Sequence, residues 1–424
     1  MKKVELLLPA GNIEKLEYAI RYGADAVYLG VVDFSLRAMR KGSLITFDNL
    51  KQAIDLAHSL GAKAYLTVNI FAFNNDIKHL EECIDIIKDA NPDAILVSDF
   101  GILRLLKKYM PDTELHISTQ TNILNYECVK FWQDMGAKRV VLARELSIPE
   151  IAEIKNKVPD MEIECFIHGA QCVSFSGRCL LSDYFTSGER HANSGNCCQP
   201  CRWSYKLVEE TRPGEYYEIN EDAHGSHILS PKDLCLVEHL KEMIDAGVDS
   251  FKVEGRTKSL YYVSAVAKTY RAAIDEIYEN PNADMSKYYT ELLKVGNRGY
   301  TQGFVLGNNN GESYSYNLSK GLAGADFLFE FHGKKKHCEI DSTVSNEDEF
   351  YFVKLKNEVL VEDEIEIISP DEQFVAKVVE ILDENGNPID TANTNSEVYM
   401  KFDKNPQNYM YALARTIGVK EYVS

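Results

Sequence analysis

The chain has 424 residues, of which 45% are hydrophobic and 26% are charged, a composition typical of a globular protein with two or more domains. Its formal net charge of −19 argues against binding nucleic acid through bulk charge alone, because such binding requires Lys and Arg to displace counterions from the phosphate backbone. The N-terminal residues lack the apolar run of a signal peptide, and no window has the roughly 18 apolar residues of a spanning helix, so we expect a cytoplasmic protein without a membrane partner.

The first 170 residues repeat one pattern, in which a short apolar run rich in β-branched residues precedes a longer stretch of helical periodicity. The predicted strands are 5–8, 26–30, 63–68, 94–98, 115–120, 139–143 and 163–168, and an eighth run, 250–255, follows after a long interruption. Strict alternation of strands and helices implies parallel pairing through right-handed crossovers. We therefore predict a TIM-like (β/α)8 barrel over residues 1–310, with a doubly wound open sheet as the alternative.

The interruption between the seventh and eighth strands, about residues 169–230, is rich in Cys, Gly and Ser and is predicted to be an insertion in the barrel. After it, Ser230 and Pro231 have the pattern of an N-cap and a first helical residue, so we predict that a helix leads into the eighth strand. Residues 322–424 consist of short alternating runs separated by turn signals, which predicts a small all-β barrel or sandwich.

Polar residues follow several predicted strands at their carboxyl ends, where a (β/α)8 barrel carries its functional site. Asn69 follows the third strand, Gln120 the fifth and His168 the seventh. Glu254 and Arg256 follow the eighth. Each alone is equally consistent with a helix cap or an ordinary side-chain pair, but together they predict a polar barrel mouth, with His168 and Glu254 as the candidate catalytic groups.

Five cysteines lie in the insertion in the pattern C-x6-C-x17-C-C-x2-C, and a sixth follows it. They are Cys172, Cys179, Cys197, Cys198, Cys201 and Cys235. In a reducing compartment, clustered thiols mark metal or redox sites more often than disulfides. Four thiolates suit either zinc or an iron–sulfur cluster, although the long gaps fit a dispersed cluster better than the two close pairs of a structural zinc site.

The segments ECFIHGAQCVSFSGRCLLSDYF, NCCQPCRW, SPKDLCL and FKVEGR closely resemble the signature of the peptidase U32 family. The resemblance spans residues 1 to about 310, and the acidic β segment is similar to the C-terminal domain of the longer members. It implies a [4Fe–4S] cluster held by Cys172, Cys179, Cys197 and Cys235. Cys198 stands where members commonly have a small residue, so Cys201 and Cys198 are the alternatives to Cys197 as third ligand.

The family members most similar in architecture act on RNA, so the resemblance implies tRNA as partner, formation of 5-hydroxyuridine at the wobble position, and prephenate as co-substrate. Arg178 and Arg256 are the predicted anion-binding residues, because guanidinium groups bind carboxylates and phosphates bidentately. Asn69 and Gln120 are predicted to assist them. With so acidic a chain, tRNA binding is expected to be local to the barrel mouth and sensitive to salt.

Two other functions stay open at this point. The family name records collagenase-like proteolysis, for which His168 with Cys172 or Ser176 would supply base and nucleophile, although the sequence contains no GxSxG or HExxH motif. The other is a cluster-bearing accessory subunit, or a heterodimeric hydroxylase, that acts on a quinone precursor or rRNA. A dimer, or a second U32 protein as partner, would accompany that function.

Overall fold

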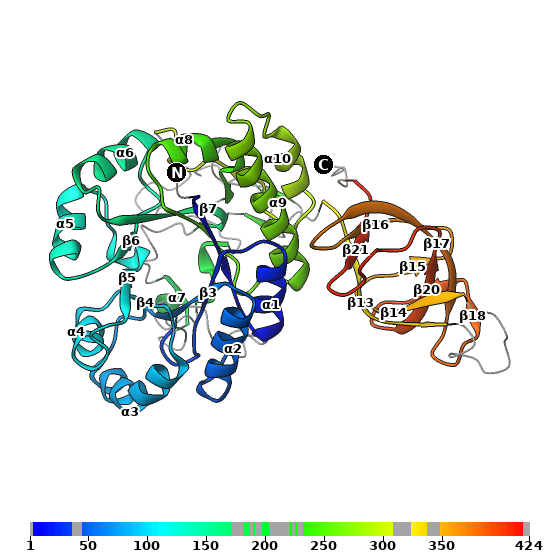
Figure 1. The fold of residues 1–424 in the computed structure, drawn as a ribbon, viewed down its shortest axis with the longest axis horizontal. Helices are drawn as coiled ribbons and strands as arrows, with labels where there is room; N and C mark the ends of the chain where they lie inside the picture. The colour runs from blue at the N-terminus through cyan, green and yellow to red at the C-terminus, as the bar shows by residue number, and fades with distance from the viewer. Residues whose placement is uncertain are drawn as a thin grey trace, which may run out of the picture. The chain divides into compact units, whose positions relative to one another are not determined.

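The structure is a computed structural model, and it describes residues 3–35, 45–171, 181–186, 190, 197–202, 221–222, 225–226, 232–307, 324–336 and 348–418. The chain divides into two compact units, one formed by Met1–Tyr289 with Asn297–Leu322 and the other by Thr290–Gly296 with Ala323–Ser424. Parallel strands and their helices form the first unit, and the second is built mainly of β-strands (Figure 1).

Eight parallel strands close into a barrel in the first unit. Strands β1 to β7 pair in chain order, and β11 pairs with both β1 and β7. The strands are β1 (Glu5–Pro9), β2 (Ala26–Leu29), β3 (Lys63–Val68), β4 (Ala94–Val97), β5 (Glu114–Ile117), β6 (Arg139–Val141), β7 (Glu162–Ala170) and β11 (Ser250–Val253). The predicted (β/α)8 barrel is confirmed, and the pairing of β11 with β7 excludes the open sheet.

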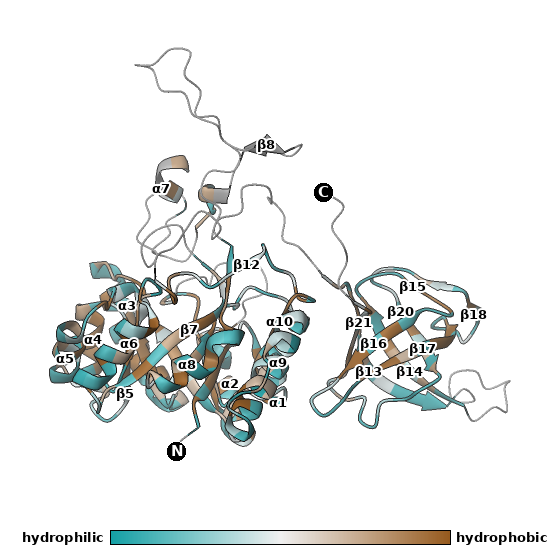
Figure 2. Cartoon of the chain, turned by 90° about the horizontal axis from the view of Figure 1, so that it is seen from above, coloured by the Kyte–Doolittle hydropathy of each residue, from teal (hydrophilic) through white to brown (hydrophobic). Residues whose placement is uncertain are grey.

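Amphipathic helices cover the outside of the barrel, and hydrophilic and hydrophobic stretches alternate along them in Figure 2. They are α1 (Ile13–Arg21), α2 (Phe47–Ser59), α3 (Asn74–Ala90), α4 (Phe100–Tyr109), α5 (Tyr126–Asp134), α6 (Ile148–Lys157), α8 (Leu240–Asp245) and α9 (Leu260–Glu279), while α10 (Ser286–Leu292) has residues in both units. Residues between strand and helix often cap the helix: Asn12 accepts a hydrogen bond from the backbone N of Lys15 at 2.8 Å, which satisfies a donor at the start of α1.

The chain between β7 and β11 departs from the predicted helix. Asp233–Cys235 forms β10, which runs antiparallel to the end of β7 and parallel to β12 (Tyr300–Thr301). Helical structure begins only at η4 (Val237–His239), while Ser230 and Pro231 lie outside the described residues. The prediction of a helix was wrong for 233–235, because pairing with β7 outweighs a local capping signal. Short elements described within the insertion are α7 (Leu181–Phe185), η3 (Pro200–Arg202), β8 (Glu221–Asp222) and β9 (Gly225–Ser226).

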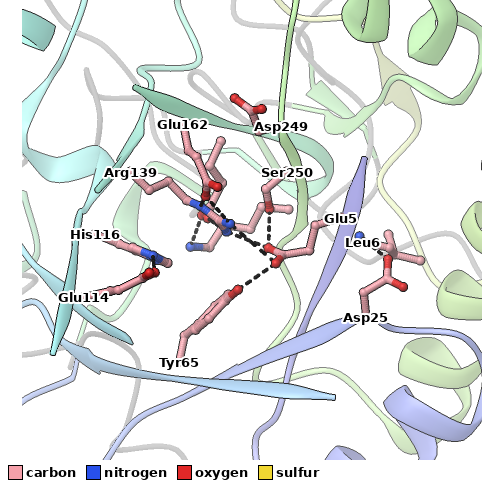
Figure 3. Close-up of polar contacts among 12 residues, drawn as sticks. Glu5, Leu6, Asp25, Tyr65, Glu114, His116, Arg139, Glu162, Asp249 and Ser250 are labelled. Atoms are coloured by element: carbon pink, nitrogen blue, oxygen red, sulfur yellow. Dashed lines mark hydrogen bonds and ion pairs between the residues drawn. The ribbon is translucent and has the colours of Figure 1, made fainter. Parts of the chain in front are cut away.

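The N-terminal ends of the barrel strands enclose a network of charged side chains (Figure 3). Arg139 Nη1 lies 2.6 Å from Glu5 Oε1, and Arg139 Nη2 lies 2.8 Å from Glu162 Oε2. Lys252 Nζ lies 2.6 Å from Oε1 of Glu164, whose side chain is fully buried. Ion pairs thus fill this end of the barrel interior, where apolar layers are usual. Opposite charges at these short distances offset part of the cost of burying charge.

The second unit is a closed antiparallel β-barrel. Its strands are β13 (Phe327–Lys336), β14 (Glu349–Leu355), β16 (Glu364–Ile368), β17 (Gln373–Leu382), β20 (Glu397–Phe402) and β21 (Leu413–Thr416), with short β15 (Val359–Leu360), β18 (Pro388–Ile389) and β19 (Thr391–Ala392). They follow the order β16-β21-β13-β14-β20-β17, and β16 pairs with β17 to complete the ring. Phe329, Val353, Ile367 and Met400 lie in its core, so the predicted all-β domain is confirmed.

Candidate functional site

His168 lies at the carboxyl end of β7 and is 1% exposed. In the pairing of β7 with β10 it stands opposite Cys235. Its Nδ1 atom lies 3.2 Å from the hydroxyl oxygen of Tyr270. Its Nε2 atom is buried and has no hydrogen-bond partner among the residues that the structure describes. One ring nitrogen is therefore held by a protein hydroxyl, and the other is left unsatisfied within the described part of the chain.

Three tyrosines surround the imidazole of His168. The ring centroids of Tyr262 and Tyr270, both on α9, lie 5.8 and 5.4 Å from that of His168, and the ring of Tyr300 on β12 lies 5.3 Å away. Tyr262 donates its hydroxyl to the backbone O of Glu254 at 3.2 Å. The aromatic faces restrict the rotation of the imidazole and keep its surroundings apolar.

The backbone beside His168 requires a glycine. Gly169 has φ +102°, and a Cβ built there would lie 2.3 Å from the backbone O of Glu254. The backbone N of Glu254 donates to the backbone O of His168 at 2.9 Å. These contacts join the ends of β7 and β11 closely, so the two predicted catalytic residues are neighbours through their main chains.

Burial controls the ionisation of His168 and Cys235, which stand opposite each other on β7 and β10. Desolvation lowers the pKa of His168 to about 3, and the positive charge of Lys258 adds to this effect. Desolvation raises the pKa of the Cys235 thiol to about 12. The imidazole is therefore neutral at pH 7, and the imidazolium that a cysteine protease needs beside its thiolate is disfavoured at His168.

The predicted thiol ligands are only partly described. Cys235 is buried, and its Sγ lies 3.8 Å from the Tyr270 hydroxyl. Cys197, Cys198 and Cys201 are half-buried. Cys172, Cys179 and the predicted anion-binding Arg178 lie outside the described residues. Within the described ranges, no group of three or more His, Cys, Asp or Glu side chains is arranged to hold a metal ion.

The two adjacent cysteines differ in their hydrogen bonds. The sulfur of Cys197 accepts a hydrogen bond from the backbone N of Gln199 at 3.3 Å. The backbone N of Cys198 donates to the hydroxyl of Ser182 at 3.0 Å, and that hydroxyl in turn donates to the sulfur of Cys198 at 3.3 Å. A backbone N–H directed at sulfur stabilises a thiolate, and such bonds are among the features that tune iron–sulfur ligands.

Arg256 lies in a cradle formed by the ends of β2 and β3. Its Nη1 atom donates to Ser35 Oγ and, at 3.0 Å, to Thr67 Oγ1, while the guanidinium carbon lies 5.7 Å from the ring centroid of Tyr28. A Cβ at Gly30 would come within 2.2 Å of both hydroxyl oxygens. The missing side chain at Gly30 thus provides the space in which Ser35 and Thr67 hold the guanidinium.

Asn69 and Gln120 meet through a shared serine. Asn69 Nδ2 donates to Ser118 Oγ at 3.4 Å, and Ser118 Oγ donates to Gln120 Oε1 at 2.5 Å. Asn69 and Ser118 are both buried. The structure therefore brings two of the predicted substrate-binding residues together at the ends of β3 and β5. Asn69 is also only two residues beyond Thr67, which contacts Arg256.

Sequence reasoning missed Ser35, Thr67, Ser118 and Tyr270. The three hydroxyl residues stand near strand ends, and that position was the signal that selected Asn69 and Gln120, so it was sufficient to find them. Tyr270 had no such signal, because it lies mid-helix among buried apolar residues and is indistinguishable from a core residue.

Comparison with known proteins identifies matches over most of the chain. A sequence model of peptidase family U32 matches residues 11–315, and one of the peptidase family U32 C-terminal domain matches residues 339–415. tRNA hydroxylation protein P1 of Bacillus subtilis is 38% identical over 418 residues, covering 96% of this chain and 94% of that protein. Uncharacterized protease MJ0090 of Methanocaldococcus jannaschii is also 38% identical over 418 residues, covering 95% and 96%.

A third relative is named for a different RNA. The 23S rRNA 5-hydroxycytidine C2501 synthase of Escherichia coli is 39% identical over 312 residues, covering 72% of this chain and 45% of that protein. Across the described part of the chain, none of the helices combines the length and the apolar character needed to cross a membrane.

Proposed function

The chain belongs to peptidase family U32, and on that premise we propose that it hydroxylates uridine in tRNA, forming 5-hydroxyuridine at the wobble position with prephenate as co-substrate. The observation that carries the proposal is the similarity to tRNA hydroxylation protein P1 of B. subtilis, which extends through both units. The match covers 96% of this chain and 94% of that protein.

Sequence identity alone does not distinguish a hydroxylase from a protease. The relative named as an uncharacterized protease is as similar to this chain as tRNA hydroxylation protein P1 is. The surroundings of His168 disfavour a cysteine protease. Such an enzyme holds an imidazolium beside a thiolate before the substrate is attacked, and an imidazole 1% exposed among three tyrosines is poorly suited to carry a standing charge. A base in the proposed reaction carries that charge only during the proton transfer.

A [4Fe–4S] cluster held by Cys172, Cys179, Cys197 and Cys235 is part of the proposal, and it would supply one-electron chemistry at the barrel mouth. The described thiols support this ligand set. Cys235 is a buried thiol at the barrel end, opposite His168, and Cys197 has a sulfur with a backbone N–H directed at it. Cys197 is proposed as the third ligand from its place in the family motif, with Cys201 and Cys198 as the alternatives.

The residues of the chain bind the co-substrate and move protons in this proposal. Arg256, held by Ser35 and Thr67, binds a carboxylate of prephenate, and Asn69 and Gln120 bind its remaining polar groups. Arg178 is proposed as a second anion-binding residue. His168 accepts a proton at Nε2, and Glu254, joined to it through the main chain, is the proposed second acid–base group.

The proposed partner is tRNA, bound through a local patch at the barrel mouth, in the cytoplasm where tRNA is used. A dimer, or a heterodimer with a second U32 protein, is proposed only for the alternative in which the chain is a cluster-bearing accessory subunit. The name of the rRNA-modifying relative makes cytidine in rRNA the second candidate substrate.

Mass spectrometry of nucleosides tests the function. The gene is expressed in a host without other tRNA uridine hydroxylases, and tRNA and rRNA are digested separately. We expect 5-hydroxyuridine in tRNA with the wild-type chain and with Cys83→Ala, but not with Cys235→Ala. Unmodified tRNA with hydroxycytidine in rRNA would transfer the proposal to rRNA. No modified nucleoside, together with cleavage of a collagen peptide by the purified chain, would establish the peptidase.

A further inference from the structure

The hydroxyl group of Tyr270 contacts three groups in the candidate site. Its oxygen lies 3.1 Å from the backbone O of Ile167, 3.2 Å from Nδ1 of His168 and 3.8 Å from Sγ of Cys235. Tyr270 has no exposed surface and lies in the middle of α9, so packing fixes the position of this hydroxyl.

The contact with Ile167 decides where the hydroxyl proton lies. A carbonyl oxygen can only accept hydrogen bonds, and two oxygens 3.1 Å apart repel unless a proton lies between them. Tyr270 therefore donates to Ile167. The same carbonyl also accepts from the backbone N of Leu236 at 2.9 Å, so both of its lone pairs are used.

The position of the hydroxyl proton in turn decides the tautomer of His168. The Tyr270 hydroxyl donates its single proton to the backbone O of Ile167 and has only lone pairs left to face His168. The Nδ1 atom of His168 must therefore be the donor. A neutral imidazole carries one proton, and Nε2 is then a bare acceptor. The absence of a partner for Nε2 among the described residues agrees with a nitrogen kept for substrate.

We propose that Tyr270 is a positioning residue that holds His168 in the tautomer with the proton on Nδ1, so that the Nε2 lone pair is free to accept a proton in the reaction. This inference rests on the proposed function for the reaction that Nε2 serves. The tautomer itself follows from hydrogen bonds within the chain and does not depend on the substrate.

Tyr262 provides a matched control. Its ring also faces His168, at 5.8 Å between centroids, and it lies on the same helix with only 3% exposure. Its hydroxyl, however, donates to the backbone O of Glu254. Tyr262→Phe thus removes one buried hydroxyl from the same aromatic surroundings without removing the hydrogen bond to Nδ1.

The test is nuclear magnetic resonance of the full-length chain with ¹⁵N-labelled histidine, in which the ring nitrogen shifts report which nitrogen is protonated. The His168 signals are assigned by their loss in His168→Gln. We expect wild type and Tyr262→Phe to carry the proton on Nδ1, and Tyr270→Phe to shift a major fraction to Nε2. A proton on Nε2 in wild type, or an unchanged tautomer in Tyr270→Phe, would overturn the proposal.

Kinetics of tRNA hydroxylation give the second readout. We expect Tyr270→Phe to lower kcat at least about tenfold with little change in KM for tRNA, because the loss affects an acid–base group and not RNA binding. Should the chain prove to act on another substrate, the tautomer measurement still stands. Failure of the proposed function and failure of this inference are therefore separate results.

Discussion

Arg256 Nη1 lies 3.0 Å from Thr67 Oγ1, so a hydroxyl at the end of β3 holds a guanidinium that follows β11. Thr67 donates in turn to the backbone O of Leu29 at 3.0 Å, which fixes the direction of its lone pairs. The orientation of the proposed anion-binding group therefore depends on a residue that carries no charge.

Replacing Thr67 tests this dependence. Thr67→Val keeps the shape of the side chain and removes the hydroxyl. A hydrogen bond to a charged group contributes about 1.5–3 kcal/mol, so we expect KM for prephenate to rise about tenfold or more with a smaller change in kcat. Thr269→Val is the control, because that buried hydroxyl donates only to the backbone O of Ala265. Equal KM values for the two variants would contradict the assigned role.

Substitutions of Gly169 and Gly61 together test whether the ends of β7 and β11 must lie close to each other. Both have positive φ, +102° and +79°, but a Cβ at Gly61 would meet nothing within 4 Å. Gly61→Ala should cost about 1–2 kcal/mol for the backbone conformation alone. Gly169→Ala should cost more and displace His168, because its Cβ has no room beside the backbone O of Glu254. Urea unfolding measures both, and similar losses would show that the two strand ends can separate without cost.

Replacing the adjacent cysteines Cys197 and Cys198 one at a time should give proteins with different iron contents. Cys197→Ala should abolish the iron and acid-labile sulfide of anaerobically purified protein, because Cys197 is the proposed third ligand of the cluster. Cys198→Ala should retain both. The reverse pattern would assign the third ligand to Cys198, and full iron in both variants would direct attention to Cys201.

Acid should weaken the ion network of the first unit. Burial by itself would raise the pKa of Glu164, but Lys252 and Arg139 outweigh burial and hold the pKa below its usual value. The unfolded chain then binds a proton at about pH 4.3 while the folded chain does not, so this stabilisation is complete above that pH and is lost as pH falls through the lower, folded pKa.

The measurement compares wild type with Glu164→Gln in urea at pH 7, 5, 4 and 3. Trp132 is buried in the first unit, so its fluorescence reports the unfolding of that unit. We expect a loss of about 3–5 kcal/mol in the variant at pH 7, because it leaves buried cations without their partner, and a smaller difference at pH 3. Glu153→Gln, at an exposed position, should leave the profile unchanged.

A second ion network stabilises the second unit. Arg415 is fully buried, and its Nε lies 2.8 Å from Glu366 Oε2 while its Nη2 pairs with Glu291. Arg415→Met should therefore destabilise this unit by about 3–5 kcal/mol, seen as faster hydrogen exchange in β16 and β21. Lys354→Met is the control, because its pair with Glu397 is exposed and such pairs contribute about 0–1 kcal/mol. Equal exchange in the two variants would contradict a stabilising role for the buried pair.

Sequence periodicity was sufficient for the architecture, because barrel strands such as AILV of β4 are apolar runs buried on both faces. It failed at Asp233–Cys235, where the partner of the strand is β7, far away in sequence. The strand-end rule selected His168, Asn69 and Arg256, which the structure places at or just beyond the carboxyl ends of β7, β3 and β11. It could not find Tyr270, because a helix residue that reaches the site through packing has the same pattern as a core residue.

The closed ring of the second unit has a consequence for its behaviour at high concentration. Because β16 pairs with β17, the long strands described there have neighbours on both sides, and unsatisfied backbone groups are confined to short segments such as β18. Exposed strand edges are the usual templates for intermolecular β-sheet growth. This unit is therefore protected against amyloid-like association by its topology, and the eleven acidic residues against one lysine in 361–400 add electrostatic repulsion between copies.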